Sequence, residues 1–289
     1  MPIGVNSAAV QRRAQVYPGF DKIGQLFTFG DSYSQTGFEP ADGAQPSAEN
    51  PIGNPELPGD TSANGPNWID YLTVEYNQST LLTYNFAYSG ATVAKSVVDS
   101  TVDVSSQVHD QYLPVYGSGS ESKYPDPTNA EILKAYSGLV EELYRSGARN
   151  FFFLNVPPID RSPLVLELGE DHQKLQAEDI SSYNKGVFEL ATNLSNNHQD
   201  TTVFYYDTNT LFSDVLDDPS KYPETALYKS TTKYCEKYES GTPSPDTFYE
   251  ECGFPANEYF WKDSLHPTDP IHKALAKGLA SMLEKGDSV

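Results

Sequence analysis

The sequence predicts an α/β fold in which helices cover both faces of a parallel sheet. Short apolar or aromatic segments alternate with stretches of helical period, as expected of repeated strand–helix units. Each apolar segment ends at Gly, Pro, Asn or Asp, which is typical of buried strands in a parallel sheet. Because no shift in composition marks a second domain, we expect one domain over residues 1–289, with its core at about 20–285.

The expected elements follow from these patterns in chain order. The segments expected as strands are Gln25–Phe29, Leu81–Phe86, Asn150–Val156 and Thr202–Tyr206. The stretches expected as helices have apolar residues at i, i+3 and i+4, and they are 67–76, Ala130–Arg145, Glu178–Asn196 and Asp269–Leu283. The segments expected as loops are 38–66 and 114–129, which are rich in Pro, Gly, Ser and Asn, and 213–262, a long aromatic and polar stretch that carries both cysteines.

One strand of the regular alternation is missing. Two helical patterns lie between the second and third expected strands, whereas a β-α-β architecture would place a strand between them. The intervening segment, YLPVYGSGSESKYPDPTNAE, contains no run of strand-forming residues. We therefore expect a sheet with one strand fewer than a regular alternation would give.

Composition excludes some partners. The 40 acidic and 19 basic residues give a formal charge of −21, which would repel nucleic acid and anionic lipid, whereas a neutral sugar is compatible with it. No stretch reaches the ~18 apolar residues of a membrane span. The two cysteines, Cys235 and Cys252, suit free thiols or a bridge equally well. Two Asn-x-Ser sequons, at Asn77 and Asn193, favour a secreted protein whose signal peptide is absent from MPIGVNSAAVQRRAQ. We expect a monomer.

Ser32 is a candidate nucleophile. It follows the first strand in FTFGDSYSQTG (residues 27–37), where Gly30 allows a tight turn and a following helix would direct amide donors at the serine oxygen. The same position suits a helix N-cap, so the serine alone does not decide between the two roles.

Asp263 and His266, in KDSLHPT, are candidates for the orienting acid and the general base. Their i,i+3 spacing places both on one side of a turn, so the carboxylate can hold one ring nitrogen while the other faces a serine hydroxyl. Gly90, in NFAYSGATV, follows the second strand, where its amide and that of Ser32 could bind an oxyanion. His109, His172, His198 and His272 have no acid at useful spacing, and no motif predicts a metal or cofactor site.

GDSYSQTG, NFAYSGA and DSLHPT, in this order, resemble the motifs of the GDSL lipase/esterase family, the SGNH hydrolases. NGPNWIDYL, GARNFFFLNVPPIDRSP and YFWKDSLHPT are similar to fungal acetylesterases of carbohydrate esterase family sixteen. The resemblance implies a three-layer α/β/α sandwich with a flavodoxin-like parallel sheet. It also implies a secreted, cofactor-free esterase that removes acetyl groups from sugars or hemicellulose-derived oligosaccharides. Ser32, His266 and Asp263 would form its triad, the Ser32 and Gly90 amides part of its oxyanion hole, and Cys235–Cys252 a disulfide.

The sequence departs from the family at the third motif. No Gly-x-Asn-Asp is present, so a central strand and the oxyanion asparagine that follows it are expected to be missing. Asn129 would need a rerouted chain to substitute, and Asn155 belongs to a later strand. Two alternatives therefore stay open beside the acetylesterase: a catalytically impaired homologue that only binds glycans, and an esterase for other short acyl groups. The aromatic residues that would either stack on sugars or pack in the core are Trp68, Tyr88, Tyr259, Phe260 and Trp261.

Overall fold

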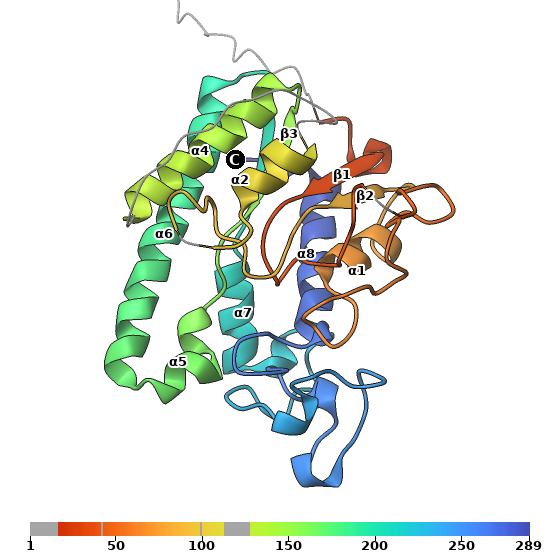
Figure 1. Ribbon diagram of the computed structural model, residues 1–289, viewed down its shortest axis with the longest axis vertical. Helices are drawn as coiled ribbons and strands as arrows, with labels where there is room; N and C mark the ends of the chain where they lie inside the picture. Colours follow the sequence, from red (N-terminus) through yellow and green to blue (C-terminus); the bar gives the residue numbers. More distant parts are fainter. Residues whose placement is uncertain (1–16, 42, 99, 113–127) are drawn as a thin grey trace, which may run out of the picture.

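The computed structural model describes residues 17–41, 43–98, 100–112 and 128–289 (Figure 1). The strands are β1 (Gln25–Thr28), β2 (Leu82–Asn85), β3 (Asn150–Leu154) and β4 (Thr202–Tyr206). The α-helices are α1 (Trp68–Val74), α2 (Val104–Ser106), α4 (Asn129–Arg145), α5 (Pro163–Glu167), α6 (Glu170–Asn197), α7 (Thr208–Asp217) and α8 (Asp269–Lys285). A π-helix, η2 (Gln107–Tyr112), continues α2, and the 3₁₀ helices are Phe20–Lys22, Ile159–Arg161, Pro219–Lys221, Glu236–Tyr238, Glu250–Cys252 and Ala256–Glu258. Each strand and each long helix that the sequence predicts is present.

The strands form two separate parallel pairs within the described residues. β1 pairs with β2 in the register Gln25↔Leu82 to Thr28↔Asn85, and β3 pairs with β4 from Asn150↔Thr202 to Leu154↔Tyr206. In the flavodoxin-like order 2-1-3-4-5 the third strand lies between the first and the fourth. The observed pairs correspond to 2-1 and 4-5 of that order, as expected of a sheet without its middle strand. Residues 113–127, which make up most of the segment expected to lack a strand, lie outside the described residues.

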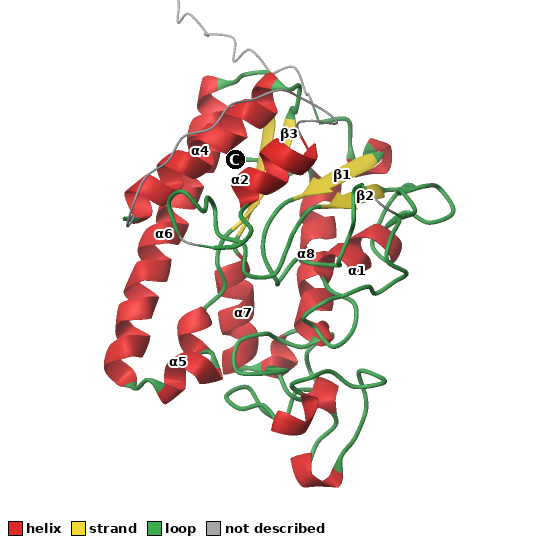
Figure 2. Cartoon of the chain, in the orientation of Figure 1, coloured by secondary structure: helices red, strands yellow, loops and turns green. Residues whose placement is uncertain are grey.

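Helices cover both faces of the strands, so the fold is an α/β/α sandwich in three layers (Figure 2). Along β3, Phe151 and Phe153 pack with residues of α4 and α6, whereas Phe152 and Leu154 pack with the cluster built by α1, α7 and α8. This alternation follows from the two-residue period of a strand, and it confirms the prediction of a sheet buried on both faces.

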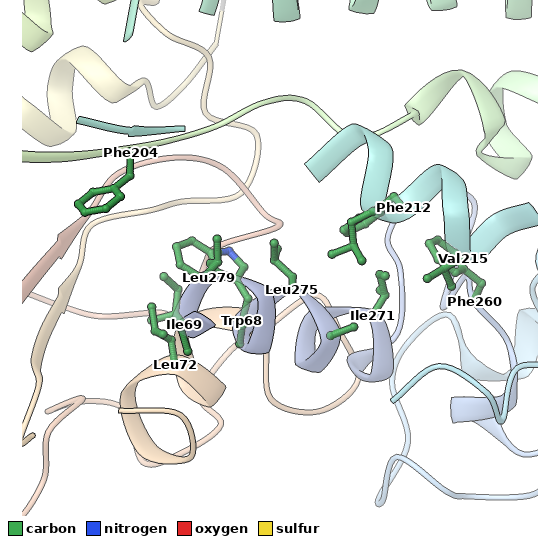
Figure 3. Close-up of a cluster of buried hydrophobic side chains, with 14 of the residues drawn as sticks. Trp68, Ile69, Leu72, Phe204, Phe212, Val215, Phe260, Ile271, Leu275 and Leu279 are labelled. Atoms are coloured by element: carbon green, nitrogen blue, oxygen red, sulfur yellow. The ribbon is translucent and has the colours of Figure 1, made fainter. Parts of the chain in front are cut away.

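The larger core lies between α1, α7 and α8. Figure 3 shows Trp68, Ile69 and Leu72 of α1 beside Leu275 and Leu279 of α8. Trp68, which the sequence left open between sugar stacking and the core, is 5% exposed and packs in the core. The other aromatic residues considered for sugar stacking separate into two groups: Tyr88 is exposed, and those that are buried are Tyr259, Phe260 and Trp261.

The stretch 213–262 is less irregular than the sequence predicts. α7 begins at Thr208 and extends to Asp217, because the Asp207 side chain caps it by accepting the Thr210 amide (3.0 Å) and its apolar face joins the core. Farther along, Cys235 and Cys252 form a disulfide with a Cα–Cα distance of 5.7 Å. The disulfide implied by the resemblance is therefore confirmed.

Asp70 in α1 is expected to make stability depend on pH. It is fully buried, one of its carboxylate oxygens accepts the Asn67 amide (2.9 Å), and the other has no partner among the described residues. Burial raises its pKa to about 7, while the Asn67 hydrogen bond opposes this shift. The unfolded chain releases this proton near pH ~4, so the native state binds more protons between pH ~4 and ~7 and loses stability as the pH rises.

Asp70→Asn is therefore expected to raise the free energy of unfolding by about 2 kcal/mol at pH 8 and to leave it nearly unchanged at pH 4. Urea unfolding at both pH values measures the difference. Asp287→Asn, at an exposed position, is a control that changes the net charge equally. Equal pH slopes for wild type and Asp70→Asn would contradict the prediction.

Candidate active site

Ser32 lies in the turn that follows β1. The amides of Ser34 and Gln35 both donate to the Asp31 carbonyl (3.0 Å each), so the chain makes a single turn here and not the helix that the sequence predicts. The Asp31 carboxylate caps this turn by accepting the Tyr33 amide (3.0 Å). Asp31 therefore takes the capping role considered for Ser32, and the Ser32 hydroxyl bonds elsewhere.

His266 lies in the loop between Trp261 and α8, and several backbone bonds fix this loop. Asp263 Oδ1 accepts the amides of Leu265 (2.8 Å) and His266 (2.7 Å). The Lys262 amide donates to the His266 carbonyl (2.8 Å), and the amide of Leu164 in α5 donates to the Ser264 carbonyl (2.9 Å). These bonds set the conformation of the loop from which the imidazole projects.

The fold brings Ser32, His266 and Asp263 into one hydrogen-bonded chain. Ser32 Oγ lies 2.9 Å from His266 Nε2 across a sequence separation of 234 residues. On the other side of the ring, Nδ1 lies 3.0 Å from Asp263 Oδ2 and 3.1 Å from Oδ1. This geometry lets the ring accept a proton from the hydroxyl while the carboxylate holds Nδ1–H.

Asp263 is ionised in this arrangement. Burial alone would raise the pKa of its carboxyl, but the hydrogen bonds from the His266 ring, the His266 amide and the Leu265 amide together hold that pKa well below its usual range. Lys262 Nζ lies 3.3 Å from Oδ2 and also donates to the Glu239 carbonyl (3.0 Å). An ionised Asp263 favours the Nδ1–H tautomer of His266, which leaves Nε2 free to accept a proton.

Gly90 lies in the turn after β2, beside the Ser32 turn. The Tyr88 amide donates to the Gly30 carbonyl (3.0 Å), the Ala91 amide closes the turn on the Tyr88 carbonyl (3.1 Å), and Gly90 itself has a φ of 77° that favours glycine. In the described part of the chain, neither the Gly90 amide nor the Ser32 amide donates to a protein acceptor. Both donors are thus available to a ligand oxygen.

Two asparagines considered for the oxyanion site are engaged elsewhere. Asn129 begins α4, and its Nδ2 is 3.4 Å from the Asp179 carbonyl of α6. The Asn155 amide donates to the Tyr205 hydroxyl (3.0 Å) and to Asp207 (2.8 Å). Neither replaces the missing asparagine of the third motif.

Two side chains that sequence reasoning missed hold the Ser32 turn. Gln107, fully buried in η2, donates through Nε2 to the Gly30 carbonyl (2.7 Å) and accepts the Gly30 amide through Oε1 (2.9 Å). Asn85, at the end of β2, donates to the Ser34 carbonyl (2.7 Å). Their partners are 77 and 51 residues away, so no local pattern could mark them.

The other histidines have structural surroundings. His109 contacts Glu142 (2.7 Å), and His198 contacts Glu141 (2.6 Å); these acids come from α4, so no acid at short sequence spacing was there to be found. His272 is buried, and burial, followed by the charge of His266, lowers its pKa to about 3. Over the described ranges, no group of three or more His, Cys, Asp or Glu side chains could hold a metal ion. Over the same ranges, the helices are too short or too polar to cross a membrane.

The sequence model of the family described as GDSL-like Lipase/Acylhydrolase matches residues 26–279. The chain belongs to this family. It is therefore a carboxylic ester hydrolase. It is 37% identical over 288 residues to an acetylesterase of Thermothelomyces thermophilus, a match that covers 88% of this chain and 86% of that protein.

A more distant relative from a plant agrees with this membership. A GDSL esterase/lipase of Arabidopsis thaliana is 25% identical over 174 residues, or 59% of this chain and 47% of the plant protein. Among solved structures, a mutant of an acetyl-xylooligosaccharide esterase from Geobacillus Stearmophilus aligns with a TM-score of 0.46 and 15% identity. That alignment covers 91% of this chain and 95% of the bacterial one.

Proposed function

We propose that this chain is a serine esterase that removes acetyl groups from sugars or hemicellulose-derived oligosaccharides. The observation that carries the proposal is the hydrogen-bonded chain from Ser32 through His266 to Asp263. The acetyl group is supported by the similarity to the Thermothelomyces acetylesterase, and the formal charge of −21 favours a neutral substrate, with which a sugar is compatible.

In the proposed mechanism, Ser32 Oγ attacks the acetyl carbonyl carbon while its proton passes to His266 Nε2. The carbonyl oxygen becomes an oxyanion that the Ser32 and Gly90 amides bind. When the bond to the sugar oxygen breaks, Nε2 returns its proton to that oxygen. A water molecule then attacks the acetyl-serine and gives a proton to Nε2. As the bond to Ser32 Oγ breaks, Nε2 passes this proton to Oγ, and acetic acid leaves and ionises in solvent. Asp263 stabilises the imidazolium in both halves.

Among the described residues, the proposed oxyanion site has fewer donors than the family motifs supply, because the asparagine of the third motif is absent from the sequence. Removal of one donor lowers kcat by about 10²–10³-fold in enzymes of this kind. We therefore expect turnover of acetyl esters that is slower than in relatives that retain the asparagine. A homologue that binds glycans without turning them over is the alternative that the missing motif favours.

Covalent labelling combined with acetate release tests the proposal. Diethyl p-nitrophenyl phosphate should modify one serine per chain, and peptide mass spectrometry should place the adduct on Ser32. The enzyme should also release acetate from acetylated xylo-oligosaccharides. Within the series of p-nitrophenyl esters, it should hydrolyse the acetate faster than the esters of longer acids. An adduct elsewhere would overturn the assignment of Ser32, and glycan binding with no acetate release would favour the impaired homologue.

We further propose that the chain acts outside the cell as a monomer built from a single domain. The Cys235–Cys252 disulfide supports the location, because such bridges persist in oxidising compartments. Sedimentation of the purified protein would test the monomer.

A further inference from the structure

Tyr33 joins the two halves of the candidate active site. It follows Ser32 directly in the sequence, and its hydroxyl donates to the carbonyl of Leu265, the residue before His266, at 2.7 Å. This bond spans a sequence separation of 232 residues and runs parallel to the Ser32–His266 contact. Among the described residues, these two hydrogen bonds are the direct ones between the Ser32 turn and the His266 loop.

The surroundings of Tyr33 keep its hydroxyl protonated, so that it can donate a hydrogen bond. Its ring centroid lies 5.9 Å from that of His266 and 6.4 Å from that of His272, so the ring fills the space beside the base. Burial, with smaller contributions from the Asp31 and Asp263 carboxylates, raises the pKa of Tyr33 well above its usual range. The hydroxyl therefore stays protonated at any pH at which the enzyme would work.

The two bonds behave differently during the proposed reaction. Once Ser32 Oγ is acetylated it has no proton to donate, so its hydrogen bond to His266 Nε2 is lost. The Tyr33–Leu265 bond involves no reacting atom and persists through the acetyl-enzyme. We propose that Tyr33 is a positioning residue that holds the His266 loop in place while Ser32 carries the acetyl group, so that His266 can activate water for deacylation. This inference rests on the proposed function.

Tyr33→Phe tests this role, because it removes the hydroxyl and keeps the ring. Tyr17→Phe is the matched control: the Tyr17 hydroxyl donates to the carbonyl of Leu283 (2.9 Å), also across the fold, but Tyr17 packs in the core away from Ser32. Both variants lose one tyrosine-to-carbonyl bond and should lose similar stability in urea unfolding. Activity is compared at a temperature well below either unfolding midpoint.

With p-nitrophenyl acetate, Tyr33→Phe is expected to lower kcat by about 10-fold without raising KM, since misplacement of a base by a fraction of an ångström has effects of this order. Slower deacylation should also raise the amplitude of the p-nitrophenol burst before steady state toward one p-nitrophenol per functional site. Tyr17→Phe should leave kcat, KM and the burst within about 2-fold of wild type.

Each other outcome overturns the inference. Equal kcat losses in the two variants would assign Tyr33 a general stabilising role. An unchanged kcat in Tyr33→Phe would mean that the bond is dispensable, while the proposed function would stand on wild-type turnover. If KM rises and no burst appears, Tyr33 acts on substrate binding. A wild type without turnover would reject the proposed function itself.

Discussion

Ser32→Ala is expected to lower kcat for p-nitrophenyl acetate by about 10⁴–10⁶-fold, as removal of a triad nucleophile does elsewhere. The variant keeps the backbone amides at position 32 and at Gly90, so the remaining turnover should come from direct attack by water on a substrate bound at the oxyanion site. Among the described residues, the Ser32 hydroxyl bonds only to His266 Nε2. The free energy of unfolding of the variant should therefore lie within about 1 kcal/mol of the wild-type value. The measurement is p-nitrophenol release at saturating substrate, beside urea unfolding of the same sample.

Ser34→Ala separates loss of the nucleophile from damage to the turn. Ser34 lies in the same turn, where its Oγ accepts the indole N–H of Trp68 (3.1 Å) and makes no contact with His266. Its removal should reduce stability by about 1 kcal/mol and kcat by less than 10-fold. Comparable losses of activity in the two variants would argue that the turn matters and Ser32 is not the nucleophile.

Local patterns account for most of the fold. Thr202–Tyr206 was predicted to the residue because an aromatic, β-branched run begins and ends at polar residues. The helix expected from Glu178 begins at Glu170. Its first turns were missed because they are polar and carry no apolar stripe. α5 was missed because a helix of five residues leaves no period to detect. A sheet with one strand fewer was expected because no strand pattern lies between the second and third expected strands, and the structure adds that the strands form two separate pairs. The single domain stays a prediction.

The candidate site also contains residues that local patterns predicted and residues that they could not predict. Ser32, Asp263 and His266 were chosen from short motifs, and the structure brings them together, although their catalytic roles stay predictions. Gln107, Asn85 and Tyr33 could not be found, because each acts through its side chain on a distant backbone group. A residue that holds a peptide group far away in the sequence follows no spacing rule. Such contacts depend on the whole fold.

Asp263→Asn is expected to lower kcat at neutral pH by about 10⁴-fold while leaving the loop intact. In wild type, Oδ1 accepts the Leu265 and His266 amides, and Oδ2 faces the imidazole and Lys262. An asparagine can keep its carbonyl oxygen on the two amides, which places its NH₂ group against His266 Nδ1. That group can only donate, so the ring would carry its proton on Nε2, where it cannot accept the Ser32 proton.

This reasoning predicts more than a loss of rate. Asp263→Ala cannot force the wrong tautomer, but it leaves the two amides without their acceptor, so it should lose more stability than Asp263→Asn while losing no more activity. The comparison requires kcat and the urea midpoint for both variants. If Asp263→Asn were the less stable of the two, or kept more than about one tenth of wild-type kcat, Asp263 would serve to cap the loop and would not orient the base. The tautomer argument would then fail, even with Ser32 established as the nucleophile.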